Sequence, residues 1–323
     1  MRIGIVGATG IVGQELVAIL AASSVQICEL RLAASSKSVG KKVPTHLGEC
    51  TLVELNTDFF RGLDFCFFCV SAAVSSKWVP AAASQGVVCV DNSSAFRMDA
   101  EVPIVVPEVN GELLAQRPQI IANPNCCVAQ LTAALHPLNR KFGLEEVNVC
   151  TYQSVSGAGE EAMRQLATEA VNYPHLNWCR GQYIFNIIPE IGPCDPNGHS
   201  LEEQKIIQET RKILQHPQLP IVANAARVPV FWGHCEGVSF VSRAPATASQ
   251  IRQCLLNAPN IVLCDEGPQP VSVRGANSVF VGRIRQNIWH RQRSFSFWLV
   301  ADNLRKGAAH NALSILETWC EMR

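Results

Sequence analysis

The sequence lacks an excess of either charge. Lysine and arginine together number 27, aspartate and glutamate also number 27, and charged residues make up only 17% of the chain. No run of like charge occurs along it. Nucleic acids and anionic membranes are bound through concentrated positive charge, so we expect neither as a partner. The expected partners are small molecules.

A leader peptide and a long apolar span are lacking as well. The chain runs from its first residue into the strand-like segment MRIGIVG, which has the composition of neither a signal peptide nor a membrane helix. We therefore expect a cytoplasmic protein whose fourteen cysteines are reduced thiols.

The cysteines do not form a metal-binding pattern. Cys66 and Cys69 make a single CxxC inside the apolar run LDFCFFCV, and no second pair supplies further ligands. This segment is predicted to be a buried strand, and no metal site is expected. The sequence also has no internal repeat and no low-complexity tract.

The first part of the chain has the pattern of a parallel α/β sheet. The 323 residues, of which 48% are hydrophobic, are enough for two packed domains. Between Arg2 and Asn123, apolar strand-like runs alternate with helix-like segments such as Val12–Ala22. The expected strands are Ile3–Gly7, Ile27–Ala34, Leu63–Val70 and Val87–Asp91.

The second part has the pattern of a mixed α/β domain. A helix is expected over Cys127–Lys141, and an amphipathic helix over Leu304–Met322, which would pack back on the first domain. The expected strands are Val147–Val155, Ile221–Val241, Ser278–Ile284 and Phe295–Val300. We therefore predict a first domain over residues 1–125, joined by the helix at 304–323, and a second over 126–303.

A glycine-rich turn follows the first strand. Gly7, Gly10 and Gly13 form GATGIVG, just ahead of the expected helix. The groups that would approach a dinucleotide pyrophosphate belong to Gly7, Thr9, Gly10, Ile11, Val12 and Gly13. This predicts a Rossmann-like, doubly wound nucleotide-binding domain. The glycine spacing differs from the common dinucleotide fingerprint, and such turns also occur for packing alone.

The second strand ends in hydroxyl groups and a cation. An NAD site usually has an acid here for the ribose hydroxyls, but this sequence has Ser35, Ser36, Lys37 and Ser38. These side chains favour the 2′-phosphate of NADP, which is the expected cofactor. The alternative is a solvated loop with an incidental lysine.

Cys126 is the candidate nucleophile. In the segment NPNC it stands where a helix is expected to begin, and the positive end of a helix stabilises a thiolate. Cys127 is the nearest rival, but as the next helical residue it points about 100° away. A thiolate that attacks an acyl carbon needs a proton-transfer partner, and His234 is the best-placed histidine. A lone histidine is more often structural.

These motifs resemble those of the aspartate-β-semialdehyde dehydrogenases, particularly the bacterial branch. The matching segments, in chain order, are GATGxVG, VVPEVN, NPNC, TYQxVSGAG, EExK, RxPVxxxH, FVGRIR and ADNLRKGAA. The resemblance implies reversible reduction of β-aspartyl phosphate by NADPH, giving aspartate semialdehyde and phosphate. This reaction serves the biosynthesis of lysine, diaminopimelate, threonine and methionine. The resemblance also implies a homodimer whose second domain is both catalytic and dimerising.

The resemblance assigns roles to single residues. It implies Cys126 as nucleophile, His234 as acid/base, and Gln153 as the amide that orients the acyl group. The implied substrate-binding residues are Arg227 for the α-carboxylate, Glu202 for the α-ammonium, and Arg97, Lys205 and Asn125 for the phosphate. The implied cofactor contacts near the nicotinamide are Ser156, Gly157 and Asn303.

Two spacings bear on these assignments. Glu202 and Lys205 are three apart on a predicted helix and share a face, as groups for one zwitterionic substrate should. An exposed ion pair is the ordinary alternative. Arg227 and His234 are seven apart, which in a regular strand would place them on opposite faces. We therefore predict irregular backbone at the intervening proline or glycine.

The sequence departs from the family pattern at three places. Asn123 stands where relatives often have cysteine, and Cys127 and Val128 replace small hydroxyl residues. The stretch Val171–Ser200 is shorter than in bacterial relatives.

Two other functions stay open. The first is another acyl-phosphate or thioester reductase with the same architecture, such as an N-acetylglutamyl-phosphate reductase or a glyceraldehyde-phosphate dehydrogenase. Their substrates have no ammonium for Glu202 to pair with. The second is a catalytically silent paralogue, against which the presence of Cys126, Gln153, Arg227 and His234 argues.

Overall fold

The chain forms two compact units. The computed structural model describes residues 1–173, 175, 179–288 and 292–322. The first unit consists of Met1–Asn125 together with the chain from Ala308 onward, and the second of Cys126–Gly307.

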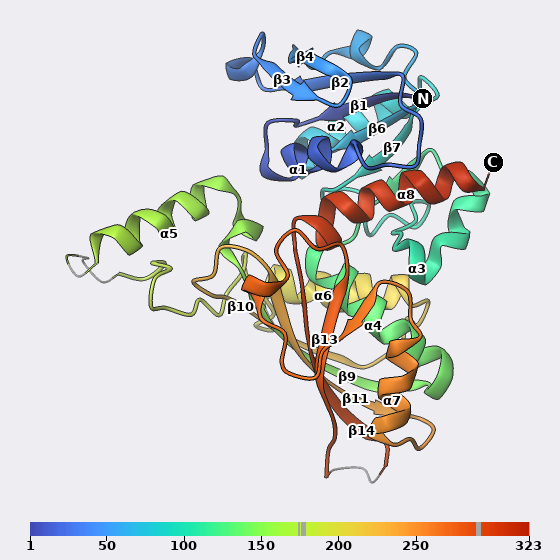
Figure 1. Cartoon of the computed structure of the whole chain (residues 1–323), viewed down its shortest axis with the longest axis vertical. Coiled ribbons are helices and arrows are strands. Elements are labelled where there is room, and N and C mark those ends of the chain that lie inside the picture. The colour runs from blue at the N-terminus through green and yellow to red at the C-terminus, as the bar shows by residue number, and fades with distance from the viewer. Residues whose placement is uncertain (174, 176–178, 289–291, 323) are drawn as a thin grey trace. The chain divides into compact units, whose positions relative to one another are not determined.

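The first unit is built on a six-stranded parallel sheet (Figure 1). Its strands, in the order in which they lie side by side, are β5 (Val53–Glu54), β2 (Glu29–Ala34), β1 (Arg2–Val6), β6 (Phe65–Phe68), β7 (Val88–Asp91) and β8 (Ile120–Ala122). Its helices are α1 (Ile11–Leu20), α2 (Ala72–Ala83), α3 (Pro107–Asn110) and α8 (His310–Glu321). A hairpin of β3 (Lys42–Thr45) and β4 (Gly48–Thr51) follows β2. The strand order changes direction at β1, the point at which doubly wound sheets bind ligands. The predicted fold class is confirmed.

Both faces of this sheet are buried, which explains the continuous apolar strands. Along β6, Phe65 and Phe67 belong to the core that contains α1 and α8, whereas Cys66 and Phe68 belong to the core that contains α2. Burial raises the pKa of the Cys66 thiol well above its usual range. The CxxC segment is therefore part of a core strand, as expected.

The C-terminal helix completes the core of the first unit. Trp319 of α8 packs edge-on against Phe65, with ring centroids 6.1 Å apart. The residues ahead of this helix form a π-helical turn over Arg305–Ala309. The regular helix therefore begins at His310, later than the expected Leu304.

The second unit is built on a six-stranded mixed sheet. Its strands, in spatial order, are β10 (Ile221–Arg227), β9 (Leu144–Gln153), β11 (His234–Ser242), β14 (Ser294–Ala301), β13 (Val279–Gln286) and β12 (Ile261–Leu263). Its helices are α4 (Cys126–Phe142), α5 (Glu160–Asn172), α6 (Leu201–Ile213) and α7 (Ala248–Leu256). Of these, α4, α6 and α7 pack against strands of the sheet. The side chains that alternate with the buried ones along β9 and β10 include Tyr152 and Val222, which are exposed.

The prediction of a single long strand over Ile221–Val241 is wrong. The chain forms two strands there, β10 ending at Arg227 and β11 beginning at His234. They lie on opposite sides of β9, one parallel to it and the other antiparallel. Gly233, with φ of +83°, lies in the connection between them. The predicted irregular backbone between Arg227 and His234 is confirmed, and it resolves the odd spacing.

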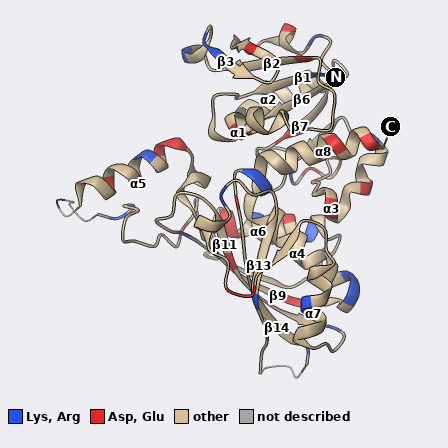
Figure 2. Cartoon of the chain, in the orientation of Figure 1, with Lys and Arg blue, Asp and Glu red and all other residues tan. Residues whose placement is uncertain are grey.

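Charged residues of both signs are interspersed over the elements of both units (Figure 2). None of the described helices is long and apolar enough to cross a membrane.

Candidate active site

The glycine turn of the first unit is closely packed at two of its three glycines. Gly7 has φ of +87°, and a Cβ on it would lie 2.3 Å from the carbonyl oxygen of Cys69. A Cβ on Gly13 would lie 2.2 Å from the oxygen of Gly7. A Cβ on Gly10 would lie 3.5 Å from its nearest neighbour, the oxygen of Gly7. Close packing therefore explains the glycines at positions 7 and 13 but not the one at position 10. The turn ends at Gly10, and Ile11 and Val12 open helix α1.

A cavity of about 290 Å³ adjoins this turn. Gly7 lines it together with Ser35 and Ser36, at the carboxyl ends of β1 and β2. It is further lined by residues that the sequence did not single out, including Glu54, Val70 and Trp78. Lys37 is exposed and Ser38 half-buried in the turn that follows β2. Thr9 lies elsewhere, in a second cavity between α1 and the β3–β4 hairpin.

Arg97 and Asn123 are fixed by backbone groups of the first unit. Arg97 is buried, and its Nε and Nη2 donate to the carbonyl oxygens of Asn123 and Asn92 at 2.9 and 2.8 Å. Asn123 in turn donates to Asn92 Oδ1 and accepts from Asn311 Nδ2. The asparagine that replaces a cysteine of the family pattern therefore has a bracing role. Asn125 is also buried.

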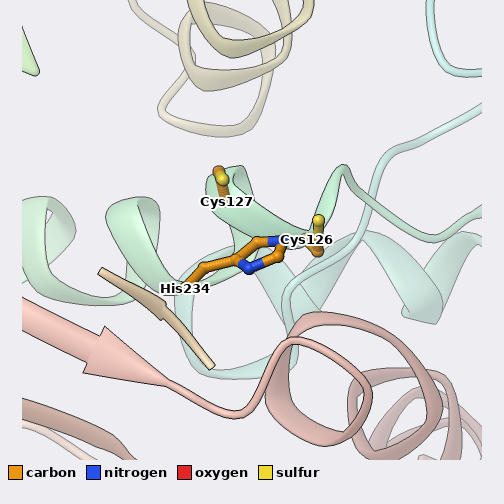
Figure 3. A group of neighbouring side chains, drawn as sticks. All are labelled: Cys126, Cys127 and His234. Carbon is orange, nitrogen blue, oxygen red and sulfur yellow. The ribbon is translucent and has the colours of Figure 1, made fainter. Parts of the chain in front are cut away.

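Cys126 is the first residue of α4, and its thiol is acidified. A hydrogen bond with Cys127 lowers the pKa of the Cys126 thiol well below its usual range, against the opposing effect of burial, and His234 lowers it further. The two sulfurs and a ring nitrogen of His234 all lie within 4.8 Å of one another. Figure 3 shows the imidazole beside Cys126 at the start of the helix. This is the geometry of a thiolate nucleophile with a proton donor at hand. That no metal is required stays a prediction.

The tautomer of His234 follows from its backbone partner. The N–H of Ser154 donates to Nδ1 at 3.1 Å, and the Ser154 hydroxyl lies 3.0 Å from the same atom. Because an amide N–H can only donate, Nδ1 accepts, and the neutral ring carries its proton on Nε2. Among the described residues Nε2, although buried, has no hydrogen-bond partner. It is therefore positioned to donate a proton to a ligand oxygen.

The substrate-binding candidates of the second unit form one hydrogen-bonded chain. Gln153 Nε2 donates to Glu202 Oε1 at 3.2 Å, and Gln153 Oε1 accepts from Arg227 Nη1 at 3.3 Å. Lys205 Nζ lies 3.3 Å from Glu202 Oε2. The ion pair considered from the sequence does form, but it is not exposed, because the Glu202 side chain is only 8% exposed. A buried carboxylate, an amide and a guanidinium are thus held at the ends of adjacent strands and the start of α6.

Asn303, Ser156 and Gly157 surround His234. Asn303 Oδ1 accepts from the Ser154 hydroxyl at 3.1 Å and from Gly233 N at 3.0 Å, and its Nδ2 donates to Ser156. A Cβ on Gly157 would lie 2.9 Å from Arg227 Nη1 and 3.0 Å from His234 Nε2. Gly157 therefore keeps the space in front of these two groups open, whereas Asn303 braces the loop behind them. Their cofactor contacts stay predictions.

The sequence did not single out Ser154, which sets the tautomer of His234. It lies next to Gln153 in the segment TYQSVSGAG, so the same motif contained the signal. Glu54 and Trp78, which line the cavity near Gly7, come from separate segments with no motif of their own.

Comparisons with known proteins identify the family of the chain. The family model described as "Semialdehyde dehydrogenase, NAD binding domain" matches residues 2–117, and that described as "Semialdehyde dehydrogenase, dimerisation domain" matches residues 135–306. The aspartate-semialdehyde dehydrogenase of Bacillus subtilis is 40% identical, with 98% of this chain and 97% of the relative covered.

Solved structures extend the similarity to the fold. The aspartate semialdehyde dehydrogenase II from Vibrio cholerae, complexed with ASA, has a TM-score of 0.94 at 37% identity, covering 99% of this chain and 98% of that one. The Candida albicans enzyme with NADP has a TM-score of 0.79 at 26% identity, covering 99% and 98%. The nucleotide-binding and mixed α/β units thus both have counterparts in these proteins, and the chain belongs to the aspartate-semialdehyde dehydrogenase family.

Proposed function

We propose that this protein catalyses the reversible, NADPH-dependent reduction of β-aspartyl phosphate to aspartate semialdehyde and phosphate. The observation that carries the proposal is the buried chain of Glu202, Gln153 and Arg227 beside an acidified Cys126. The reaction would serve the biosynthesis of lysine, diaminopimelate, threonine and methionine, as the resemblance implies. The cytoplasmic location of the protein stays a prediction.

Cys126 would act as the nucleophile. Its thiolate attacks the acyl carbon, a carbon–sulfur bond forms, and the carbon–oxygen bond to phosphate breaks, so that phosphate leaves with the electron pair. The lowered pKa of the Cys126 thiol favours the thiolate, so this step would need no separate base. The thioester is then reduced to a thiohemiacetal, which returns its hydroxyl proton to His234 as it collapses to the aldehyde and regenerates the Cys126 thiolate.

His234 would supply the proton. A negative oxygen develops at the former carbonyl both when the thioester forms and when it is reduced. The Nε2 proton is held toward the ligand because Ser154 occupies Nδ1. Donation from a fixed, buried position stabilises such an oxyanion more than water does.

Arg227 and Glu202 would bind the α-groups of the substrate. A guanidinium matches a carboxylate with two parallel hydrogen bonds, and a buried carboxylate pairs with an ammonium. Gln153 joins the two residues and would set their separation. Lys205, Arg97 and Asn125 are proposed to bind phosphate, on the strength of the family resemblance.

The residues of the first unit fit a dinucleotide cofactor. The open position at Gly10, at the N-terminus of α1, and the cavity beside Gly7 provide room for a pyrophosphate and a nucleoside. When bound, the cofactor supplies a hydride. We propose NADP over NAD because Ser35, Ser36 and Lys37 offer donors and a cation for a 2′-phosphate.

Lys37→Glu should then raise KM for NADP far more than for NAD. Glu54, an acid that lines the cavity beside Gly7, provides a control of opposite charge. Glu54→Gln removes a negative charge and should not weaken the binding of NADP. Equal use of NAD and NADP by the unaltered protein would contradict this preference.

We also propose a homodimer formed through the second unit. The match to a dimerisation domain supports it, and so does the exposed apolar surface of β9 and β10 at Tyr152 and Val222. Sedimentation equilibrium tests the proposal. A molecular mass equal to that of one protomer at micromolar protein concentration would contradict it.

The deciding experiment for the reaction is phosphate-dependent oxidation of aspartate semialdehyde, run with NADP and NAD in parallel. N-acetylglutamate semialdehyde and glyceraldehyde 3-phosphate are the comparison substrates, because neither has a free α-ammonium for Glu202. Activity on aspartate semialdehyde alone, dependent on phosphate, is the expected result. Preference for either comparison substrate would assign the chain to another acyl-phosphate reductase, and no activity on any would favour a silent paralogue.

A further inference from the structure

Three polar side chains form a closed hydrogen-bond network behind His234. Asn303 follows strand β14, and Ser154 and Ser156 follow strand β9. His234 begins strand β11, which lies between those two strands, and all four side chains are buried. Asn303 Nδ2 lies 3.0 Å from Ser156 Oγ, the two serine oxygens are 3.0 Å apart, and Ser154 Oγ lies 3.1 Å from Asn303 Oδ1. The proposed reaction uses none of these three contacts.

The direction of each hydrogen bond follows from two backbone groups. The N–H of Gly233 donates to Asn303 Oδ1 at 3.0 Å, so Oδ1 is the acceptor and Nδ2, the donor, is directed to Ser156. The N–H of Ser154 takes the single lone pair of His234 Nδ1, and the Ser154 hydroxyl therefore donates to Asn303 Oδ1. The Ser156 hydroxyl, 3.2 Å from the same Oδ1, then donates to Ser154 Oγ. Each hydrogen has an acceptor of its own in this arrangement.

The network places an acceptor as well as a donor against Nδ1 of His234. The backbone nitrogen of Ser154 lies 3.1 Å from Nδ1, and Ser154 Oγ lies 3.0 Å from the same atom. Because the hydroxyl hydrogen is turned toward Asn303, the oxygen presents a lone pair to the imidazole. In the neutral imidazole Nδ1 accepts from the N–H, and in the charged imidazole a proton on Nδ1 donates to Ser154 Oγ. Both protonation states therefore have a partner.

We propose that Asn303 is a positioning residue for His234, which acts through the Ser154 hydroxyl and lets the imidazole take up a second proton on Nδ1. The inference rests on the proposed role of His234 as the proton donor. A charged imidazole, formed with a proton from solvent, gives its Nε2 proton to the substrate oxyanion and becomes neutral. The proton returns to Nε2 when the thiohemiacetal collapses. An imidazole that was neutral at the start would have to become an anion to give up the same proton.

Groups from neighbouring helices and strands also act on the charge of His234. The sulfurs of Cys126 and Cys127, from α4, lie within 4.8 Å of a nitrogen of the imidazole. A Cys126 thiolate favours the charged imidazole, whereas burial raises the pKa of the Cys127 thiol well above its usual range and keeps it neutral. Arg227, at the end of β10, opposes the charged imidazole, because a Cβ on Gly157 would lie within 3.0 Å of both side chains.

The acidic groups of the surroundings have partners or are neutral. Glu202, on α6, is paired with Lys205. Glu236, two residues beyond His234 on β11, is neutral at physiological pH because burial raises its pKa to about 8. Asp302, next to Asn303, accepts from backbone N–H groups. All of these groups remain in the variants below, so their contribution is common to every measurement.

The test is a pH titration of the His234 imidazole by ¹⁵N NMR, in full-length protein labelled with ¹⁵N histidine. The resonances of His234 are those that are missing from the His234→Asn protein. Ser154→Ala removes the acceptor and leaves the backbone N–H. The midpoint for protonation of Nδ1 should fall by about one pH unit, since a hydrogen bond to a charged group is worth about one such unit or more.

Two substitutions at Asn303 should move this midpoint in opposite directions. Asn303→Leu removes the acceptor of the Ser154 hydroxyl, which then turns to Nδ1 and lowers the midpoint. Asn303→Asp keeps an acceptor and adds a negative charge, which raises it. Ser239→Ala is the matched control, because it removes a hydroxyl of another serine pair on β11, in which Ser239 Oγ and Ser296 Oγ are 2.7 Å apart. It should leave the midpoint unchanged.

Each outcome decides the proposal. An unchanged midpoint in a folded Ser154→Ala protein overturns it. Equal falls in Asn303→Leu and Asn303→Asp also overturn it, because Asn303 would then act by packing alone. A raised KM for NADP in Asn303→Asp with an unchanged midpoint would limit Asn303 to cofactor binding, which is again contrary. The titration requires no turnover, so full activity of His234→Asn would overturn the proposed proton donor separately from the network.

Discussion

The neutral state of Glu236 predicts a specific dependence of stability on pH. In the folded protein its pKa is raised, mainly by burial, from 4.5 to about 8. A group with a raised folded pKa contributes stability that is fully present below the unfolded pKa, and that contribution is lost as the pH rises through the folded pKa. Glu236→Gln replaces the neutral acid with an uncharged group of the same shape and should abolish this dependence.

The magnitude follows from the width of that pH window. Each pKa unit corresponds to about 1.4 kcal/mol, so the interval from 4.5 to about 8 corresponds to about 5 kcal/mol. The free energy of unfolding of Glu236→Gln, minus that of the unaltered protein, should therefore rise by several kcal/mol between pH 4.5 and pH 8. Above that range the difference should be constant, because Glu236 is then ionised in both states.

Urea unfolding at half-unit pH steps, followed by tryptophan fluorescence, measures this difference. Glu266→Gln removes an exposed glutamate of the same unit and should give a curve close to that of the unaltered protein. A difference between Glu236→Gln and the unaltered protein that stays flat from pH 4.5 to pH 9 would refute the argument, because it would mean that Glu236 is ionised in the folded state.

Three further results are expected from the proposed reaction. Cys126→Ala should abolish turnover while NADPH binding, measured by fluorescence titration, persists; an active Cys126→Ala protein would move the nucleophile to another thiol. His234→Asn should lower kcat by about 10² to 10⁴, and a near-native pH–rate profile would remove His234 from the mechanism. Glu202→Gln should lower kcat/KM for aspartate semialdehyde and leave succinate semialdehyde, which has no ammonium, nearly unaffected. An equal loss on both substrates would make Glu202 a structural partner of Lys205.

Much of the fold could be predicted from the sequence because its signals are local. The apolar runs around β1, β6 and β7 lie in a sheet buried on both faces, which gives continuous apolar segments rather than alternating ones. The helix over Cys126–Phe142 was expected to within one residue at each end. The error over Ile221–Val241 has a clear cause: two apolar strands follow one another closely, and periodicity alone does not mark the place where the chain leaves one side of β9 for the other.

The proposed nucleophile and the proposed α-group binding residues were singled out from motifs, but the contacts that set their chemical states could not be. A sequence places Cys126, His234 and Ser154 on three separate segments, whereas the tautomer of the imidazole depends on one backbone N–H reaching one ring nitrogen. Such contacts are set by the register of β9 against β11, in which Cys235 pairs with Tyr152. A shift of one residue in that register would turn Ser154 away from His234 and leave the ring free to carry its proton on either nitrogen.

The same reasoning explains why Glu236 was not singled out. In the sequence it is one acid in HisCysGlu, and a glutamate is ordinarily exposed and ionised. Its character changes only because β11 is a central strand covered by α4, so that the side chain has no route to water. Once Glu236 is buried, desolvating the ionised carboxylate costs more free energy than keeping the carboxyl group protonated at neutral pH. Gln130 donates a hydrogen bond to one of its two oxygens. A residue type that predicts a surface charge thereby becomes a buried neutral group paired with Gln130.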